Sequence, residues 1–415
     1  MVAVQELSSG GMLAAIPSKS RHRILIVGGG TAGITVAARL KRAGERDIAL
    51  LEPSPHHYYQ PLWTLVGAGL AKVGETVRPE ANYIPKGVKW IQDAAAELDP
   101  ARNRVHTLGG QVLEYDFLII CPGIQIDWDL IPGLQDALKT PFVSSNFDSA
   151  LAPKTWQMIR DFRGGNALFT NPATPIKCGG APQKIMYLAA DFWRRSGVKA
   201  AITFGHSGAV IFGVKEFAAV LTEVVARYEI DVHFKRDLVE VRPERREAVF
   251  KILGSETGET ETLPYDIMHV TPPMSAPDFI KRSPLAVTDS PLGWAKVDKF
   301  TLHSPDYPNV FALGDAGSTP NSKTGAAIRA QAPVVAQNLL SVMAGREPTH
   351  KYNGYSSCPL VTTHNRVLLA EFDYDMKPAP SIPIINTQKE RYDMYLLKRY
   401  GLPWMYWNLM LKGMV

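Results

Sequence analysis

The fold is decided by residues 23–33, which read RILIVGGGTAG. The first five residues form a largely apolar run, of the kind that builds a strand buried in a parallel sheet. Glycines follow at Gly28, Gly30 and Gly33, and this G-x-G-x-x-G spacing permits a tight turn and close approach of the backbone to a pyrophosphate. The stretch therefore predicts a dinucleotide-binding α/β fold.

The residues that follow complete the nucleotide-binding unit. We expect a helix over Ile34–Arg42 and a second strand over Ile48–Leu51 that ends in Glu52. The helix N-terminus would offer N–H groups to a pyrophosphate, and Glu52 could accept a hydrogen bond from a ribose hydroxyl. A glycine turn without a ligand is the simpler alternative, but strand, helix and acidic residue together favour a nucleotide.

Two later segments favour FAD over a nicotinamide cofactor. Residues 115–123, YDFLIICPG, read as a buried strand that ends in a turn at Gly123, and residues 309–315, NVFALGD, read as a strand that delivers Gly314 and Asp315. With the first segment, they resemble the two-dinucleotide-binding-domain flavoproteins. In that family the strand-borne aspartate meets the ribityl chain of FAD. Alternatively, Asp315 could cap the helix expected beyond residue 320.

A second nucleotide site, which an NADH-dependent enzyme would need, is not recognisable. The segment 200–210 has the expected strand but lacks G-x-G-x-x-G. Phe212, Val214 and Lys215 follow where a helix would need small residues. We therefore expect the second Rossmann-like domain to be a vestigial NAD-type domain.

The chain has three cysteines, too few for a disulfide framework and without the spacing of a zinc site, so we expect no metal. Cys178 follows Lys177 and precedes a helix expected over Gln183–Phe192, and both features favour a thiolate. Cys358 lies among serines in a stretch that reads as an exposed loop. If the two thiols meet beside a flavin, they predict dithiol/disulfide redox chemistry.

Cysteines that merely fill space are the alternative for Cys178 and Cys358, because free cysteine is commonly buried. Cys121, at the end of an apolar strand, fits that interpretation much better. We assign Cys121 to packing beside the cofactor.

Four separated blocks give a more specific resemblance, which extends from about Arg21 nearly to the C-terminus. They are similar to the two-cysteine type of sulfide:quinone oxidoreductase, the type that includes the mitochondrial enzyme. The blocks are residues 56–69 (HHYYQPLWTLVGAG), 177–187 (KCGGAPQKIMY), 269–275 (HVTPPMS) and 355–362 (YSSCPLVT).

The resemblance implies a reaction. At rest, Cys178 and Cys358 would form a disulfide, or a trisulfide with one bridging sulfur. Hydrosulfide would attack at Cys358 and leave a persulfide there, and the Cys178 thiolate would reduce the flavin. Reduced FAD would then pass two electrons to ubiquinone, while the sulfane sulfur leaves to a small-molecule acceptor.

The resemblance also implies roles for lysines. Lys323 would face the flavin pyrimidine, where a cation stabilises anionic reduced flavin, while Lys184 and Lys398 would lie on the quinone side. A solvated surface lysine is the alternative in each case. The expected cofactor-binding residues are Gly28, Gly30, Gly33, Glu52, Gln60, Gly123, Gly314, Asp315 and Lys323.

The expected division of the chain has four parts. The FAD-binding Rossmann domain would comprise residues 21–130 and 291–350, interrupted by the second Rossmann-like domain over 131–290. Residues 351–415 would form a C-terminal redox-cysteine and quinone or membrane region.

The C-terminal tail, residues 391–415, is rich in aromatic and basic side chains, which suits a segment lying in the headgroup plane of a membrane. We expect Gly401 and Pro403 to break it into short pieces. No stretch is long and apolar enough to span a bilayer, so a peripheral, monotopic association is predicted. An amphipathic helix packed on the protein's own core is the alternative.

The net charge of +5 comes from Lys and Arg spread along the chain, and nothing points to nucleic acid. Residues 1–20 show neither a secretory signal nor a clear presequence, so we expect a bacterial inner-membrane location, with the mitochondrial inner membrane as the alternative. Two other functions stay open: a type II NADH:quinone oxidoreductase, and a non-enzymatic flavin-binding redox sensor or assembly factor.

Overall fold

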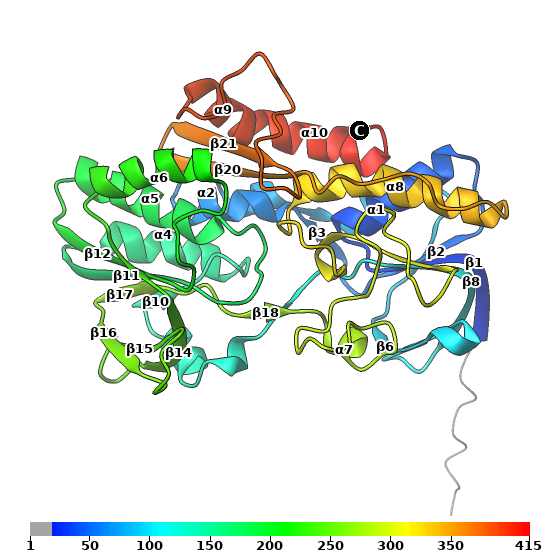
Figure 1. The fold of residues 1–415 in the computed structure, drawn as a ribbon, viewed down its shortest axis with the longest axis horizontal. Coiled ribbons are helices and arrows are strands. Elements are labelled where there is room, and N and C mark those ends of the chain that lie inside the picture. The colour runs from blue at the N-terminus through cyan, green and yellow to red at the C-terminus, as the bar shows by residue number, and fades with distance from the viewer. Residues whose placement is uncertain (1–18) are drawn as a thin grey trace, which may run out of the picture.

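The structure is a computed structural model that describes residues 19–415. The sequence interpretation of residues 1–18 therefore lies outside the described residues. Within the described chain, two parallel sheets lie side by side along the long axis, each with helices beside it (Figure 1).

The first sheet contains the predicted nucleotide-binding unit. Its parallel strands run in the order β5 (Lys89–Ile91), β2 (Ile48–Leu51), β1 (Lys19–Val27), β8 (Val112–Ile120) and β19 (Val310–Ala312). β7 (Arg104–Thr107) and β6 (Ala95–Asp99) extend the sheet antiparallel from the beginning of β8. The strands expected at all three cofactor segments are confirmed.

The chain leaves the first sheet after β8 and returns to it only at β19. Between them lies a second parallel sheet with the order β10 (Val143–Ser144), β17 (Ile267–His269), β11 (Gly165–Asn171), β12 (Ala200–His206) and β13 (Asp231–Phe234). The crossings between the sheets pair with each other as β9 (Gln125–Ile126) and β18 (Met274–Ser275) (Figure 1).

Smaller antiparallel elements complete the strands. A three-stranded sheet contains β14 (Arg236–Arg242), β15 (Glu247–Ile252) and β16 (Thr260–Pro264), and two hairpins contain β3 (His56–Tyr58) with β4 (Val77–Pro79) and β20 (Ser356–Thr363) with β21 (Arg366–Phe372).

The α-helices are α1 (Thr31–Arg42), α2 (Trp63–Gly67), α3 (Leu134–Lys139), α4 (Leu151–Asp161), α5 (Ala181–Arg195), α6 (Lys215–Arg227), α7 (Asp278–Lys281), α8 (Gly325–Met343), α9 (Tyr392–Leu396) and α10 (Leu402–Asn408). The first of them begins three residues earlier than expected, directly after Gly30.

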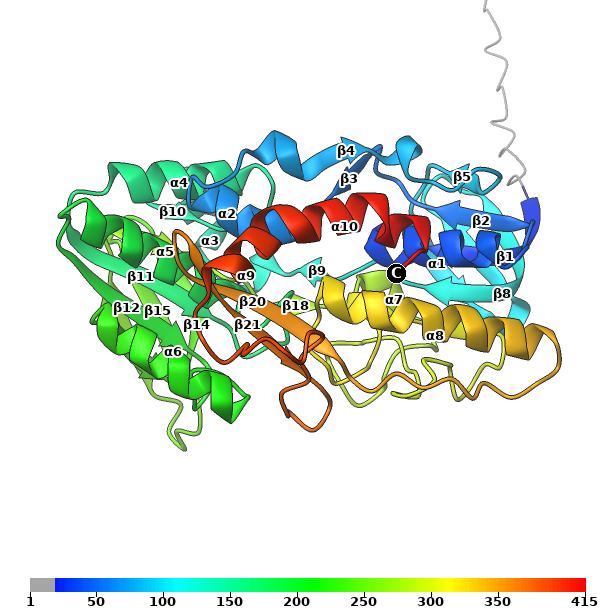
Figure 2. The ribbon, with the colours of Figure 1, turned by 90° about the horizontal axis from the view of Figure 1, so that it is seen from above.

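The tail forms one helical run, and the expected break at Gly401 and Pro403 is wrong. A π-helical turn over Leu397–Gly401 joins α9 to α10, and Pro403 lies in the first turn of α10, directly after this π turn. Figure 2 shows this run between α2 and α8, with its end above α1. In the described part of the chain, no helix is both long and apolar enough to cross a membrane.

Candidate functional site

The glycine loop has the close contacts that its spacing predicts. Gly28 has a φ of +104°, in the left-handed region that glycine tolerates. A Cβ on Gly33 would lie 1.9 Å from the carbonyl oxygen of Gly28, so only glycine lets α1 approach the strand this closely. Gly30, in contrast, would direct a Cβ into open space, which leaves the backbone of the turn free for a ligand.

An acidic corner adjoins this loop. Glu52 Oε2 accepts a hydrogen bond from the Gly29 N–H at 2.7 Å, and Oε1 accepts one from the Ser54 N–H at 2.8 Å. Burial raises the pKa of Glu52, partly offset by these two N–H groups. An open glycine turn beside a half-buried carboxylate fits the adenosine and pyrophosphate half of a dinucleotide.

The second and third cofactor segments end beside the first. Gly123, with φ +86°, has no atom within 4 Å of where a Cβ would point. Gly314 and Asp315 form a 3₁₀ turn directly after β19. The capping alternative for Asp315 is wrong, because Thr324 caps α8 by accepting a hydrogen bond from the Ala327 N–H.

Lys323 is buried against the Asp315 turn. Its Nζ donates to the carbonyl oxygens of Asp315 and Gly317, at 2.7 and 3.1 Å, and lies 3.8 Å from the centre of the Trp294 ring. Burial lowers the pKa of Lys323 to about 8, although Asp315 opposes the shift. The solvated-lysine alternative is therefore wrong for this residue.

The structure brings Cys178 and Cys358 together, with their Sγ atoms 3.0 Å apart. Cys178 lies in the turn before α5 with a φ of +56°, a backbone conformation that is uncommon for a residue other than glycine. Its N–H donates to the carbonyl oxygen of Lys323 at 2.7 Å. This bond ties the thiol pair to the segment that also carries Asp315.

Cys358 is not in an exposed loop, and that expectation is wrong. It lies in β20, paired with Ala370 of β21, and only 1% of its surface is exposed. The serines and Pro359 around it suggested a loop, but a proline is compatible with a strand that has a neighbour on one side only. Here β20 and β21 form a two-stranded sheet that packs on α5.

The cation at the thiols is Lys184 rather than Lys177. From the first turn of α5, Lys184 Nζ reaches to 3.0 Å from Cys178 Sγ. Lys177 Nζ instead donates to Gln60 Oε1 at 3.0 Å. The alternative that Lys184 is a solvated surface lysine is wrong, because this residue is buried.

The surroundings make the two thiols unequal. A hydrogen bond from Cys358, together with the charge and hydrogen bond of Lys184, holds the pKa of Cys178 well below its usual value. Burial, together with the neighbouring Cys178 thiolate, holds the pKa of Cys358 well above its usual value. Burial opposes the charge on Lys184, but the charges and hydrogen bonds of Cys178 and Cys358 together outweigh it and raise the pKa of the lysine.

Lys398 approaches the same site from the C-terminal run. It belongs to the π-helical turn, is 2% exposed, and donates to the carbonyl oxygen of Pro61 at 2.6 Å. Burial, with repulsion by Lys184, lowers its pKa to about 7. Here too a solvated surface lysine is ruled out.

Cys121 is buried in the first sheet, where its Sγ contacts the carbonyl oxygen of Gly28 at 3.5 Å. Burial raises the pKa of this thiol. The expected role of Cys121 in packing agrees with its place in the core, and the raised pKa disfavours the thiolate, which is the nucleophilic form.

Sequence reasoning missed a polar chain beside the glycine loop. His57 Nδ1 lies 2.8 Å from Glu80 Oε2, His57 Nε2 lies 2.6 Å from the Tyr406 hydroxyl, and that hydroxyl lies 2.7 Å from Thr31 Oγ1. Only His57 falls in one of the four resemblance blocks. Glu80 and Tyr406 carry no local signal, because the fold alone brings residues this distant in the sequence together.

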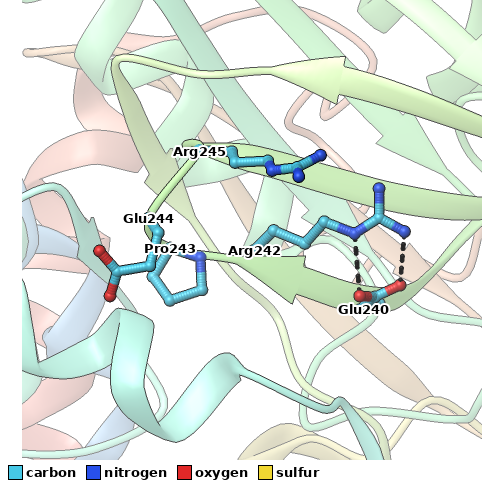
Figure 3. A pocket seen from close by; sticks show the side chains of 5 residues that line it. All are labelled: Glu240, Arg242, Pro243, Glu244 and Arg245. Atoms are coloured by element: carbon cyan, nitrogen blue, oxygen red, sulfur yellow. Dashed lines mark hydrogen bonds and ion pairs between the residues drawn. The ribbon is translucent and has the colours of Figure 1, made fainter.

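A surface hollow lies elsewhere, on the three-stranded antiparallel sheet (Figure 3). Glu240, Arg242, Pro243, Glu244 and Arg245 line it, and Arg242 is already paired with Glu240. None of the predicted site residues lines this hollow, and it adds nothing to the redox site.

Comparison with known proteins places these features in context. The family model of the pyridine nucleotide-disulphide oxidoreductases matches residues 22–161. The mitochondrial sulfide:quinone oxidoreductase of Mus musculus is 48% identical over 96% of this chain and 88% of its own length. The mitochondrial enzyme of Dictyostelium discoideum is 41% identical over 95% of this chain and 87% of its own.

A solved structure supports the fold independently. The sulfide:quinone oxidoreductase of Aquifex aeolicus superposes with a TM-score of 0.78 and covers 95% of this chain and 92% of its own, at 19% identity. At that identity the likeness concerns the fold alone. The expected α/β fold with a dinucleotide-binding domain is confirmed.

Proposed function

Because the chain belongs to the sulfide:quinone oxidoreductase family, we propose that it oxidises hydrosulfide at Cys178 and Cys358 and delivers two electrons, by way of FAD, to ubiquinone. The chain is an FAD-dependent oxidoreductase. The observation that supports the detailed proposal is the thiol pair, with Sγ atoms 3.0 Å apart, and the hydrogen bond of Lys184 Nζ to Cys178 Sγ at 3.0 Å.

The unequal thiols supply a direction for sulfide attack. In thiol–disulfide exchange, the thiol with the lower pKa leaves faster. Cys178 has the lowered pKa and Cys358 the raised one. Hydrosulfide should therefore attack the Cys358 sulfur of a Cys178–Cys358 disulfide and expel Cys178 as a thiolate paired with Lys184.

The exchange is balanced without a further reactant. The hydrosulfide sulfur forms a bond to Cys358 and gives a persulfide, while the Cys178–Cys358 bond breaks and its electron pair stays on Cys178. When bound, FAD supplies the two-electron acceptor that links this dithiol chemistry to ubiquinone. The outer sulfur of the persulfide passes to a small-molecule acceptor and leaves Cys358 as a thiol. Its renewed bonding to Cys178 would release two electrons and one proton, and bound FAD would accept the two electrons.

The three buried lysines would act by charge. Lys184 holds the Cys178 thiolate, and Lys323 would stabilise negative charge beside the Asp315 turn. Lys398, with a pKa lowered to about 7, can give up or take a proton near neutral pH. We assign Lys184 and Lys398 to the quinone side of the site and Lys323, with the glycines and Glu52, to FAD.

The C-terminal run supports a peripheral membrane association. Four exposed apolar or aromatic side chains recur every fourth residue and so share one helix face: Tyr392, Leu396, Tyr400 and Trp404. The opposite face, with Met394, Tyr406 and Trp407, is buried in the core. We therefore propose that the outer face rests in the membrane interface while the inner face packs on the protein, which combines both sequence alternatives.

The relatives favour the mitochondrial inner membrane over the bacterial one. The relatives from Mus musculus, Dictyostelium discoideum and Schizosaccharomyces pombe, at 37–48% identity, are all named as mitochondrial proteins. We accordingly propose a mitochondrial location in place of the bacterial inner membrane that the sequence alone favoured.

The proposed function is tested by anaerobic reduction of the bound flavin. Sulfide without NADH should bleach the flavin absorbance, and decylubiquinone should restore it. Cys178→Ser and Cys358→Ser should each abolish bleaching, whereas the matched Cys121→Ser variant should retain it.

No bleaching of the wild type by sulfide would overturn the assignment. Bleaching by NADH alone would support the type II NADH:quinone oxidoreductase instead. Flavin reduction without steady-state quinone turnover would favour a redox sensor.

A further inference from the structure

A second carboxylate lies beside Glu52 at the glycine loop. Glu80 is 1% exposed, and its Oε1 is buried without a hydrogen-bond partner in the described chain. A Cβ built on Gly29 would lie 2.9 Å from this Oε1 and 2.6 Å from the side chain of Glu52. Two carboxylates therefore converge on one residue of the turn.

The other oxygen of Glu80 is held in place. His57 Nδ1 lies 2.8 Å from Glu80 Oε2, and the Glu80 N–H donates to the carbonyl oxygen of Pro55 at 2.9 Å. A buried carboxylate is stable only when its acceptors are satisfied, so Glu80 Oε1, which has no partner in the described chain, requires a hydrogen-bond donor from outside it.

The polar chain that holds Glu80 ends on α1. One donor order satisfies every group: Thr31 donates to Tyr406, Tyr406 to His57 Nε2, and His57 Nδ1–H to Glu80 Oε2. Only Glu80 Oε1 then remains as a free acceptor. Because Tyr406 belongs to α10, the C-terminal helix takes part in fixing this oxygen.

We propose that Glu80 is a second carboxylate acceptor for a ribose hydroxyl of the adenosine half of FAD, beside Glu52, and that Tyr406 positions it through His57. Glu80 is thus a cofactor-binding residue, and Tyr406 is a positioning residue. A consequence is that FAD binding and docking of α10 stabilise each other, since coupling between two sites is reciprocal.

The test titrates deflavinated protein with FAD, and separately with ADP, which carries the adenosine ribose but no flavin. Glu80→Met removes both acceptors and should weaken FAD and ADP alike, by about tenfold or more. Glu80→Gln keeps one acceptor and should lose less affinity than the Met variant. Tyr406→Phe should weaken both ligands by about threefold to tenfold.

The matched control is Tyr395→Phe, since Tyr395 lies in the same C-terminal run but its hydroxyl takes no part in the polar chain. Thermal unfolding of each deflavinated variant separates a weakened fold from a weakened site. Unchanged FAD affinity in Glu80→Met and Glu80→Gln would overturn the proposal. So would a loss of FAD affinity without a loss of ADP affinity, because the ribose contact would then be absent.

Discussion

Lys184 Nζ lies 3.0 Å from Cys178 Sγ, although the residue next to Cys178 in the sequence is another lysine, Lys177. The first turn of α5 makes this contact possible, because side chains on a helix point back toward its N-terminus. The helix thus places its own lysine over the turn that precedes it. The hydrogen bond from Cys358, together with the charge and hydrogen bond of Lys184, lowers the pKa of Cys178 and so favours its thiolate form.

Replacing Lys184 with methionine should raise the pKa of Cys178 toward the ordinary thiol value. Because the thiolate is the nucleophile, alkylation of Cys178 by iodoacetamide near pH 7 should slow by about tenfold for each unit by which its pKa comes to exceed the pH. The measurement is a site-resolved rate by mass spectrometry, as a function of pH, on FAD-bound protein with reduced cysteines. The exposed Lys86→Met variant is the control, and a rate profile identical to that of wild type would contradict the role of Lys184.

Gly30 and Gly33 should respond differently to alanine. At Gly33 the new methyl group would lie 1.9 Å from a backbone oxygen, so we expect a loss of about 1–3 kcal/mol in unfolding free energy and no FAD binding. At Gly30 the methyl meets open space in the protein, so stability should change by about 0.5 kcal/mol or less. It would nevertheless occupy the cofactor's approach to the turn.

The Gly30→Ala protein should therefore fold normally and bind FAD at least about tenfold more weakly. Urea unfolding and FAD titration of the deflavinated protein test both variants, Gly30→Ala and Gly33→Ala. If Gly30→Ala bound FAD as tightly as wild type, the proposed course of the cofactor past this turn would be wrong.

The fold was predictable where a local pattern decides it. The strand, glycine turn and acidic residue from Arg23 to Glu52 all appear as expected, because each depends on neighbours within about 30 residues. The continuous helical run of the tail could not be predicted, because Gly401 and Pro403 suggest a break and the sequence gives no sign of the π turn that accommodates them.

The sequence named residues that the structure brings together, but it did not predict the contacts between them. The flanking residues of Cys358 suggested a loop, yet a buried hairpin holds it, because tertiary packing overrides local preference. The burial of Lys184, Lys323 and Lys398 likewise depends on segments distant in the sequence. No periodic pattern in the sequence predicts the burial of these lysines.

Lys398 should make stability depend on pH. A lysine whose pKa is lower in the folded than in the unfolded protein binds more protons when unfolded, so stability rises with pH between the two values. For Lys398 these are about 7 in the folded protein and about 10.4 in the unfolded chain. The loss of folding stability caused by burying the charged Lys398 is thus fully present below about pH 7, and it disappears above the pKa of the lysine in the unfolded chain.

Wild type should accordingly gain stability relative to Lys398→Met as the pH rises from about 7 to about 10, by on the order of 3 kcal/mol. Urea unfolding of both proteins across this range measures the difference, with Lys86→Met as the exposed control that should show no trend. A difference that is independent of pH would mean that Lys398 keeps an ordinary pKa in the folded protein.

The exposed stripe on the C-terminal run should govern attachment to membranes. Tyr400 and Trp404 are each 60% exposed and lie one helical turn apart, whereas the neighbouring Arg399 is paired with Glu75. Exposed aromatic side chains on one face of a helix suit the interface of a bilayer. Changing both Tyr400 and Trp404 to glutamate should weaken binding to anionic vesicles by about tenfold or more, without loss of flavin.

Vesicle co-flotation measures this binding, and Leu130→Glu is the matched control, since Leu130 is 66% exposed but lies in a turn outside the C-terminal run. Sulfide should still bleach the flavin of the double variant, because its thiol pair is untouched. Only turnover with membrane-embedded long-chain ubiquinone should fall, while a water-soluble quinone is reduced as before. Equal co-flotation of the double variant and wild type would show that another surface holds the protein to the membrane.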